Sequence, residues 1–217
     1  MIRKILSKIL PREAKNYIRS KQNLWFRTIV AWHWKRKGCP VPPPHQVKQM
    51  VIEDYQKLYG CSVLVETGTY LGDMVGAQEN NFKRIISIEL DQHLYERAKR
   101  KFRKKSNITI YHGDSSKVLP QILTTITENT ILWLDGHYSE GFTAKGDKET
   151  PIYEELEAIF QDSTHDHILL IDDARLFTGE RDYPTIEELS DFIRGKNKDY
   201  NIEVKDDIIR TLPVLYR

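Results

Sequence analysis

From Val63 to the end of the sequence, short apolar runs alternate with amphipathic segments, and this alternation limits the fold more than any other feature. Such alternation is typical of a mainly parallel sheet covered on both faces, because each parallel pair needs a long crossover connection. The last two runs are joined only by Asp206 and Asp207, so they must pair as an antiparallel hairpin. We therefore predict an α/β, Rossmann-like, doubly wound sheet of seven strands, mostly parallel, with a C-terminal antiparallel hairpin.

The predicted strands are Val63–Glu66, Arg84–Glu89, Asn107–His112, Thr130–Asp135, His167–Asp172, Asn201–Lys205 and Ile208–Tyr216. The first predicted helix ends at Gly60, and the others cover Gln92–Arg103, Ser115–Ile126, Pro151–Gln161 and Thr185–Arg194. Ahead of them, the proline-rich spacer Gly38–Pro44 can be neither a helix nor a central strand. We place the domain boundary there, with a helical extension over residues 1–44 and the α/β domain over residues 45–217.

The extension is strongly basic and amphipathic. Residues 1–37 hold eleven of the 33 Lys and Arg residues but only one of the 31 acidic residues, which makes the segment +10 and the remainder −8. Apolar side chains over residues 2–10 share one helical face up to Pro11, and a second helical pattern runs from Arg12 to Lys37. We predict that the extension packs on the body or on a second subunit, with contact to an anionic membrane surface as the next alternative.

Nucleic acid is the least favoured partner, because the body is acidic and carries no RNA-binding module. No segment is apolar enough to span a membrane, and the N-terminus lacks the features of a signal peptide. Two cysteines provide no disulfide framework. We therefore expect a cytoplasmic protein, with peripheral attachment to the inner face of the membrane through residues 1–37 as an open alternative.

The first strand ends in a glycine-containing turn that has the features of a cofactor loop. Ligands of open α/β sheets bind at the carboxyl ends of the strands, where Gly68 allows a tight turn and Gly72 close packing of the next helix. The spacing differs from the dinucleotide fingerprint, and Glu66 would repel a pyrophosphate. An acid there suits a cationic ligand such as S-adenosylmethionine (SAM). The predicted cofactor-binding residues of the turn are Glu66, Thr67, Gly68, Thr69, Tyr70 and Gly72.

Acids at the ends of the next two strands support this assignment. Glu89 follows the glycines by roughly 20 residues, where a carboxylate can accept hydrogen bonds from both ribose hydroxyls. Asp114 and Ser115 follow the third strand, and Asp114 is placed to reach an adenine amino group. With these residues, the chain from about Val47 onward resembles the class I SAM-dependent methyltransferases. Glu66 to Gly72 matches their first motif, Glu89 their ribose-binding acid and Asp114 their adenine-side acid.

Three further carboxylates follow strands four and five. Asp135 ends the fourth predicted strand, and Asp172 and Asp173 end the fifth, so we expect them to converge at one edge of the sheet. Mutual repulsion would raise the pKa of one of these carboxyl groups unless a hard divalent cation, by default Mg²⁺, relieved it. The local alternatives are that Asp172 caps a turn and that Asp173 pairs with Arg175.

This acid pattern resembles the metal-dependent O-methyltransferases of the macrocin and novobiocin type, which act on sugar hydroxyls. The resemblance implies a Mg²⁺ site at Asp135, Asp172 and Asp173, and places Asp135 at the cofactor as well. A metal-bound hydroxyl loses its proton to a weak base, for which Asp135 or His137 is the candidate. The sequence His137-Tyr138-Ser139 departs from that group, so its substrate does not transfer to this chain.

The two segments that follow these strands are the candidate substrate walls. The stretch from Glu140 to Pro151 is long for a compact domain and contains two glycines, as expected of a lid over the site. Within it, Thr150 is a candidate ligand contact or the N-cap of a helix that has Pro151 in its first position. The other wall is the segment Arg175–Pro184, with Arg181 and Tyr183.

The predicted function is SAM-dependent methyl transfer, with Mg²⁺ assistance, to a hydroxyl of a saccharide or other small molecule. Two alternatives remain open. One is a SAM-binding enzyme of another type, either hydroxylase-like or a metal-free transferase. The other is a non-catalytic SAM-binding partner protein, although such a protein has no need of the set Asp135, Asp172 and Asp173.

Overall fold

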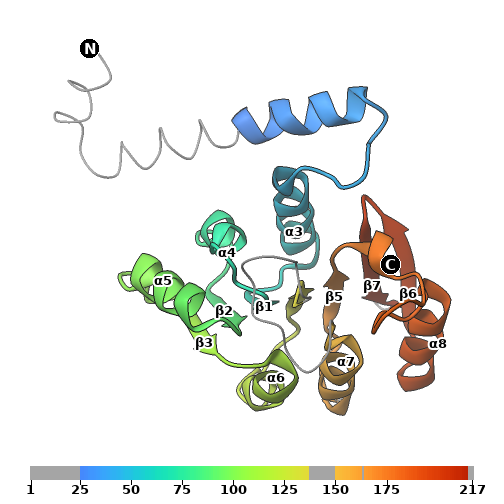
Figure 1. Ribbon diagram of the computed structural model, residues 1–217. Helices are drawn as coiled ribbons and strands as arrows, with labels where there is room; N and C mark the ends of the chain where they lie inside the picture. The colour runs from blue at the N-terminus through green and yellow to red at the C-terminus, as the bar shows by residue number, and fades with distance from the viewer. Residues whose placement is uncertain (1–24, 137–149, 163, 215–217) are drawn as a thin grey trace.

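The computed structural model describes residues 25–136, 150–162 and 164–214. Its centre is one seven-stranded sheet in the order β3-β2-β1-β4-β5-β7-β6, with β7 antiparallel to β5 and β6 (Figure 1). The strands are β1 (Val63–Thr67), β2 (Arg84–Glu89), β3 (Ile108–His112), β4 (Ile131–Leu134), β5 (Ile168–Ile171), β6 (Tyr200–Lys205) and β7 (Ile208–Pro213). The predicted fold, including the C-terminal hairpin, is confirmed.

Burial on both faces explains why the central strands are nearly continuous apolar runs rather than alternating ones. Every residue of β1, β4 and β5 is buried. The strand limits differ from the predicted ones by one to three residues at some ends, and β4 and β5 stop before Asp135 and Asp172. These two acids therefore lie just beyond the pairing region, at the carboxyl edge.

Helices cover both faces of the sheet and form two hydrophobic cores. On one side α3 (His45–Tyr59), α4 (Asp73–Gln78) and α5 (Gln92–Phe102) pack through side chains such as Ile52, Val75 and Phe102. On the other, α6 (Ser115–Leu123), α7 (Ile152–Gln161) and α8 (Ile186–Lys196) contribute Leu119, Leu156, Leu189 and others. This doubly wound arrangement places the two helix layers on opposite faces of the sheet (Figure 1).

Side-chain caps fix where several of these helices begin. Asp91 accepts a hydrogen bond from the Leu94 amide at the start of α5, and Thr185 forms a capping box with Glu188 at the start of α8. The predicted cap of α7 is wrong. Pro151 is itself the N-cap residue, the helix begins at Ile152, and no side chain caps it. Thr150 is instead buried one residue before the cap.

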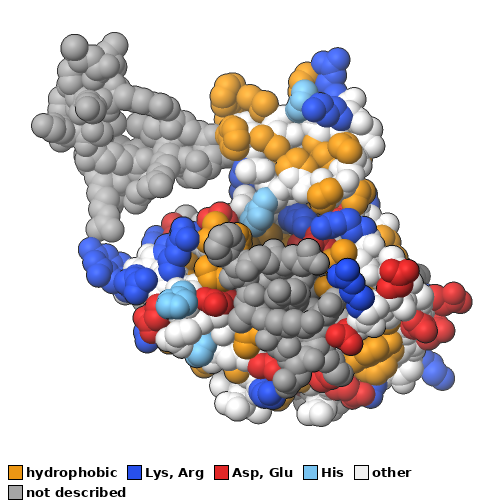
Figure 2. Space-filling model, viewed as in Figure 1, with side chains coloured by type: hydrophobic (Ala, Val, Ile, Leu, Met, Phe, Trp, Pro, Cys, Tyr) orange, Lys and Arg blue, Asp and Glu red, His pale blue; other side chains and the backbone are white. Residues whose placement is uncertain are grey.

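The described part of the extension is a helix over residues 25–36 that packs on α3 (top of Figure 1). Ala31 and Trp34 contact Val47 and Met50 of α3, and the indole Nε1 of Trp34 donates to the Pro40 carbonyl at 2.8 Å. Residues 38–44 contain neither a helix nor a strand, as the proline-rich spacer predicts. Figure 2 shows hydrophobic side chains on the surface of this part of the molecule.

The predicted helix over residues 2–10, like the start of the second one, lies outside the described residues. None of the helices in the described ranges is both long and apolar enough to cross a lipid bilayer.

Candidate functional site

The turn after β1 is shaped by two glycines in left-handed conformations. Gly68 has φ +86°, and a Cβ atom built on it would lie 2.4 Å from the backbone oxygen of Asp135. Gly72 has φ +67° and leaves no room for a Cβ, which would lie 2.7 Å from the ring of Phe102. Both predicted glycine roles, a tight turn and close packing of the next helix, are confirmed. The turn therefore brings the ends of β1 and β4 into direct contact.

Glu66 lies near the end of β1 as a buried carboxyl. The Ser87 hydroxyl donates to its Oε2 at 2.5 Å, and Thr69 Oγ1 lies 2.6 Å from the same hydroxyl. Burial raises the pKa of Glu66 to about 8, against the lowering effect of Ser87. The sequence did not single out Ser87, whose position opposite Glu66 follows from the pairing of β1 with β2. The three residues form a polar chain beneath the glycine turn.

Glu89 ends β2 beside the same turn. Its carboxylate accepts hydrogen bonds from the backbone amides of Tyr70 at 2.6 Å and Asp91 at 2.9 Å. Burial outweighs these bonds and raises its pKa. The bond to Tyr70, a residue with φ +47°, holds the glycine turn against β2. A ribose contact of Glu89 stays a prediction.

Asp114 and Ser115 follow β3 on the same edge of the sheet. Asp114 caps α6, accepting hydrogen bonds from Ser116 through its amide at 3.0 Å and its hydroxyl at 2.7 Å. One carboxylate oxygen, Oδ1, makes both bonds, while Oδ2 lies 3.4 Å from Lys117 at the surface. The adenine contact of Asp114 stays a prediction, and capping is the role that the geometry gives it.

The three predicted metal ligands converge. Asp135, Asp172 and Asp173 each place one carboxylate oxygen within 4.8 Å of the others. They do so because β4 and β5 are parallel neighbours, with Leu134 paired to Ile171, so the residues that follow them share one edge. Both local alternatives occur as well. The Asp173 amide donates to Asp172 Oδ1 at 2.8 Å, and Arg175 Nη1 donates to Asp173 Oδ1 at 2.7 Å.

Lys48 of α3 is a site residue that the sequence analysis missed. Its ammonium group lies 2.7 Å from Asp172 Oδ2 and 2.7 Å from Asp173 Oδ1. Burial opposes the charged form, but the two carboxylates outweigh this effect and raise the pKa of Lys48. No signal in the sequence links Lys48 to acids more than 120 positions away. Only the docking of α3 against the end of β5 brings them together.

The β6–β7 hairpin supports the cluster from the other side. Its turn residue Asp207 accepts hydrogen bonds from the backbone amide of Arg175, at 2.9 Å, and from the Arg175 guanidinium. Asp135, Asp172 and Asp173 offer three carboxylate oxygens, which are ligands that Mg²⁺ accepts. The residues present therefore fit a Mg²⁺ ion.

Burial and mutual repulsion perturb the acids themselves. Burial first, and then the charges of Asp172 and Asp173, raise the pKa of Asp135 well above its usual value. The same two effects, with Asp173 as the neighbour, raise the pKa of Asp172 to about 6. Perturbed carboxyl groups that converge at the carboxyl edge of an α/β sheet are typical of functional sites.

Glu155 of α7 is a second residue that the sequence analysis missed. It is 1% exposed, and its Oε1 has no hydrogen-bond partner within the described part of the protein. Burial raises its pKa to about 7, although Ser115 and Thr67 donate hydrogen bonds to it. With Gly136, Thr150 and Asp172 it lines a hollow of about 10 Å³, room for about one water molecule. The sequence did offer one signal for Glu155. It is the one acid on the buried face of α7, whose other buried residues are apolar.

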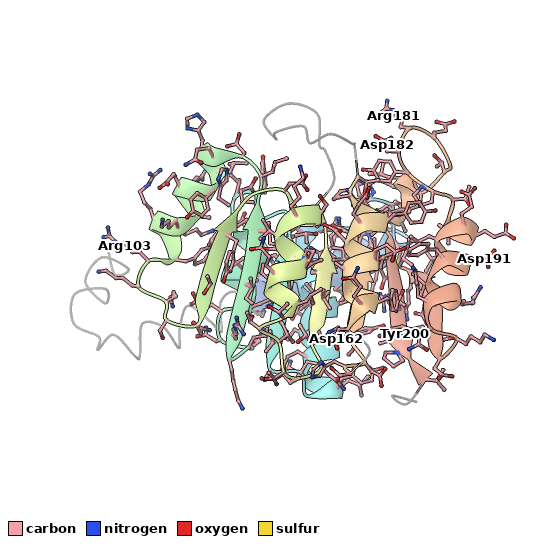
Figure 3. The ribbon with its side chains drawn as sticks, turned by 90° about the horizontal axis from the view of Figure 1, so that it is seen from below. Arg103, Asp162, Arg181, Asp182, Asp191 and Tyr200 are labelled. Atoms are coloured by element: carbon pink, nitrogen blue, oxygen red, sulfur yellow. The ribbon has the colours of Figure 1, made fainter. Side chains whose placement is uncertain are left out.

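The predicted substrate walls are only partly described. His137 and residues 140–149 lie outside the described residues. In the second wall Tyr183 is buried, and its ring packs edge-on against Phe177 with centroids 5.5 Å apart. Arg181 and Asp182 lie at the carboxyl end of the sheet, the end opposite Asp162 (Figure 3).

Another group with metal-binding side chains lies at the amino end of the sheet, where Asp162, His165 and His167 approach one another. His167 Nδ1 accepts a hydrogen bond from the Thr130 amide at 3.3 Å. That bond leaves the proton of the neutral ring on Nε2, the atom that would have to bind the metal. This group therefore acts as a structural hydrogen-bonded cluster.

By sequence, no protein-family profile and no curated protein matches the chain. Solved structures do match it in three dimensions. The O-methyltransferase TomG from Streptomyces achromogenes, involved in tomaymycin synthesis and in complex with SAM, matches with a TM-score of 0.57 at 14% identity, over 86% of this chain and 88% of that one. An O-methyltransferase from Bacillus cereus in complex with SAH matches with a TM-score of 0.57 at 13% identity, over 97% and 96%.

The SAH-bound methyltransferase PaMTH1 from Podospora anserina matches with a TM-score of 0.56 at 14% identity, over 94% of this chain and 98% of that one. At such identities the likeness establishes the fold. The chain therefore has the Rossmann-like fold of class I methyltransferases.

Proposed function

We propose that this protein is a SAM-dependent O-methyltransferase that acts, with Mg²⁺ assistance, on a hydroxyl of a saccharide or other small molecule. One observation carries the proposal. The glycine turn of β1 and the three converging carboxylates lie at the same edge of the sheet, where Gly68 touches the backbone of Asp135. A cofactor on the turn and an acceptor at the acids would therefore be neighbours.

The cofactor half of the proposal rests on the turn and the two acids beside it. Gly68 and Gly72 let the turn pack closely on the Asp135 backbone and the Phe102 ring, where a Cβ would not fit. Glu89 is held in place by two backbone amides, so its carboxylate is oriented before any ligand binds. TomG and the Bacillus cereus enzyme, which share this fold, were solved with SAM and SAH bound.

The acceptor half rests on the acid cluster. Asp135, Asp172 and Asp173 would hold Mg²⁺, which when bound supplies a positive charge that makes a hydroxyl more acidic. Asp135 lies beside the glycine turn, since its backbone oxygen is the atom that a Cβ on Gly68 would meet, and its carboxylate oxygen would receive the proton of the acceptor. Lys48 orients both Asp172 and Asp173, donating to each at 2.7 Å, and Arg175 donates to Asp173 at 2.7 Å.

Lys48 also supports a second candidate, a metal-free O-methyl transfer. Its ammonium group already bridges two of the three carboxylates, as a cation would. In that case Lys48 supplies the positive charge beside the acceptor oxygen, and activity would not depend on a divalent ion.

Calorimetry on separate variants tests the two halves independently. We expect SAM to bind the wild-type chain, and to bind Glu89→Gln at least about tenfold more weakly because the ribose loses a charged acceptor. The matched control is Glu79→Gln, a half-buried acid that pairs with Lys105 at 3.0 Å away from the site. Equal SAM affinity of wild type and Glu89→Gln would refute the cofactor assignment.

The metal is tested by titrating Mg²⁺ into wild type and Asp172→Asn. Loss of Mg²⁺ binding only in the variant supports the metal site, and unchanged binding removes it. Release of SAH from SAM is then followed with saccharide and small-alcohol acceptors, with and without a chelator. Turnover that survives chelation but is lost in Lys48→Met selects the metal-free candidate, and no turnover with any acceptor of either class contradicts the proposed substrate.

A further inference from the structure

The helix over residues 25–36 has two apolar faces, and only one of them is used within the described chain. Ala31 and Trp34 form the inner face against α3. Trp25, Ile29 and Trp32 are spaced by four and three residues, so they share the opposite face, which we call the outer stripe. Their exposed fractions are 71%, 41% and 56%. Phe26, beside the stripe, is 55% exposed.

Such a stripe needs a partner. The apolar face of a helix is normally buried, and clusters of exposed aromatic side chains on a domain surface mark interaction sites. The inner face and the Arg27–Glu53 ion pair, at 2.8 Å, fix this helix on α3. The stripe therefore points away from the domain on a firmly docked element. Figure 2 shows the hydrophobic surface that results above α3.

Charge indicates what the partner is. Residues 25–37 include four Lys or Arg residues and no acid, and the segment 1–37 as a whole is +10. Arg36 stacks over the Trp32 ring at 4.7 Å, so a cation lies directly against the stripe. Exposed indoles flanked by basic side chains are typical of helices that lie in the interface of an anionic bilayer. We infer that the outer stripe binds an anionic lipid surface.

A second copy of the chain is a poorer occupant. A symmetric dimer through this face would bring the same patch of both subunits together, and with it two segments of +10 each. Repulsion between them opposes the contact, whereas a bilayer with anionic headgroups attracts the same charges. The inference does not depend on the reaction proposed above.

The four tryptophans of the chain provide the test, because two are on the stripe and two are buried. Trp34 and Trp133 are 4% and 1% exposed and serve as internal references. The full-length protein is mixed with phosphatidylcholine vesicles, with or without phosphatidylglycerol, and binding is measured by cosedimentation. Vesicles with brominated acyl chains then report which indoles enter the bilayer, since bromine quenches only nearby tryptophans.

We expect binding to the anionic vesicles only, weakening as salt is raised, with quenching of part of the tryptophan fluorescence. The variant Trp25→Ser/Trp32→Ser should bind at least about tenfold more weakly, because the stripe loses most of its apolar area. The control is Leu58→Ser on α3, a side chain that is 70% exposed but lies outside the stripe, and it should bind as wild type.

Three results would overturn the inference. The first is failure of the wild-type chain to bind anionic vesicles. The second is binding that is unaffected by the double substitution. The third is a vesicle-free dimer in sedimentation experiments that dissociates in the Trp25→Ser/Trp32→Ser variant, which would assign the stripe to a second copy. SAM binding, measured on the same samples, separates these outcomes from failure of the proposed function.

Discussion

Replacing Glu155 by glutamine should make the protein less sensitive to rising pH. The wild-type carboxyl is 1% exposed, and burial raises its pKa from 4.5 to about 7. Between these values the unfolded chain has released a proton that the folded chain still holds, so stability must fall as pH rises. At 1.36 kcal/mol per pH unit, the full penalty reached above pH 7 is about 3 kcal/mol. Glutamine has no such penalty.

The assay is urea denaturation of wild type and Glu155→Gln at pH 5 and pH 8. Most of the pH-dependent loss falls between these values, so the stability difference between the two proteins should shift by about 2.5 kcal/mol in favour of the variant. Glu157→Gln, on the same helix, is the matched control. The Glu157 side chain is 48% exposed, and its substitution should change stability by less than about 0.5 kcal/mol at either pH.

The reasoning fails if wild type and Glu155→Gln lose stability in parallel between pH 5 and pH 8. That outcome would mean that the carboxyl reaches water, or that a cation in the hollow keeps it ionised. A change in the denaturant dependence itself would instead indicate an altered unfolded or native state.

Three other substitutions test the site and its frame. Gly68→Ala should lower the free energy of unfolding, measured in urea, by at least about 2 kcal/mol, because the left-handed φ and the 2.4 Å approach to Asp135 both oppose a Cβ. The control is Gly195→Ala, which has open space around it and should be neutral or stabilising. Lys48→Met should cost about 3 kcal/mol, because the buried Asp172 loses its cationic partner while Asp173 keeps Arg175. Added Mg²⁺ should then raise the melting temperature of the variant more than that of wild type, and equal rises would show that Lys48 and the ion do not share ligands. Thr185→Ala removes the capping box of α8 and should lower the stability of the protein by about 1 kcal/mol. Thermal denaturation measures this loss, and an unchanged melting temperature would contradict the cap.

The pattern of the sequence was sufficient for the architecture. Buried parallel strands must be apolar on both faces, so the runs that became β1, β4 and β5 were visible as continuous stretches. The two-residue link at Asp206 and Asp207 allowed only a hairpin. The start of α7 was not predicted correctly. Thr150 has the residue type of a cap, but the chain turns into α7 one residue later, at Pro151.

The candidate site could be predicted where it depends on strand ends, and it could not where it depends on helix docking. Asp135, Asp172 and Asp173 follow two strands of the sheet, so their convergence followed from topology. Lys48 and Glu155 reach the same region from α3 and α7, and their contacts depend on how each helix is rotated against the sheet. Helical periodicity identifies a buried face, but it does not say which polar group beneath that face will be the neighbour.

By itself, the sequence determined the order of strands and helices, the glycine turn and the acids at the strand ends, because these features depend on local conformation and on the spacing of apolar residues. Only the tertiary structure decided that Lys48 bridges Asp172 and Asp173, that Glu155 is buried with one oxygen unpaired among the described residues, and that Trp25 and Trp32 remain exposed. The physical reason is that the charge state and the exposure of a side chain depend on neighbours that are distant in sequence. Those neighbours are set by the packing of whole helices on the sheet.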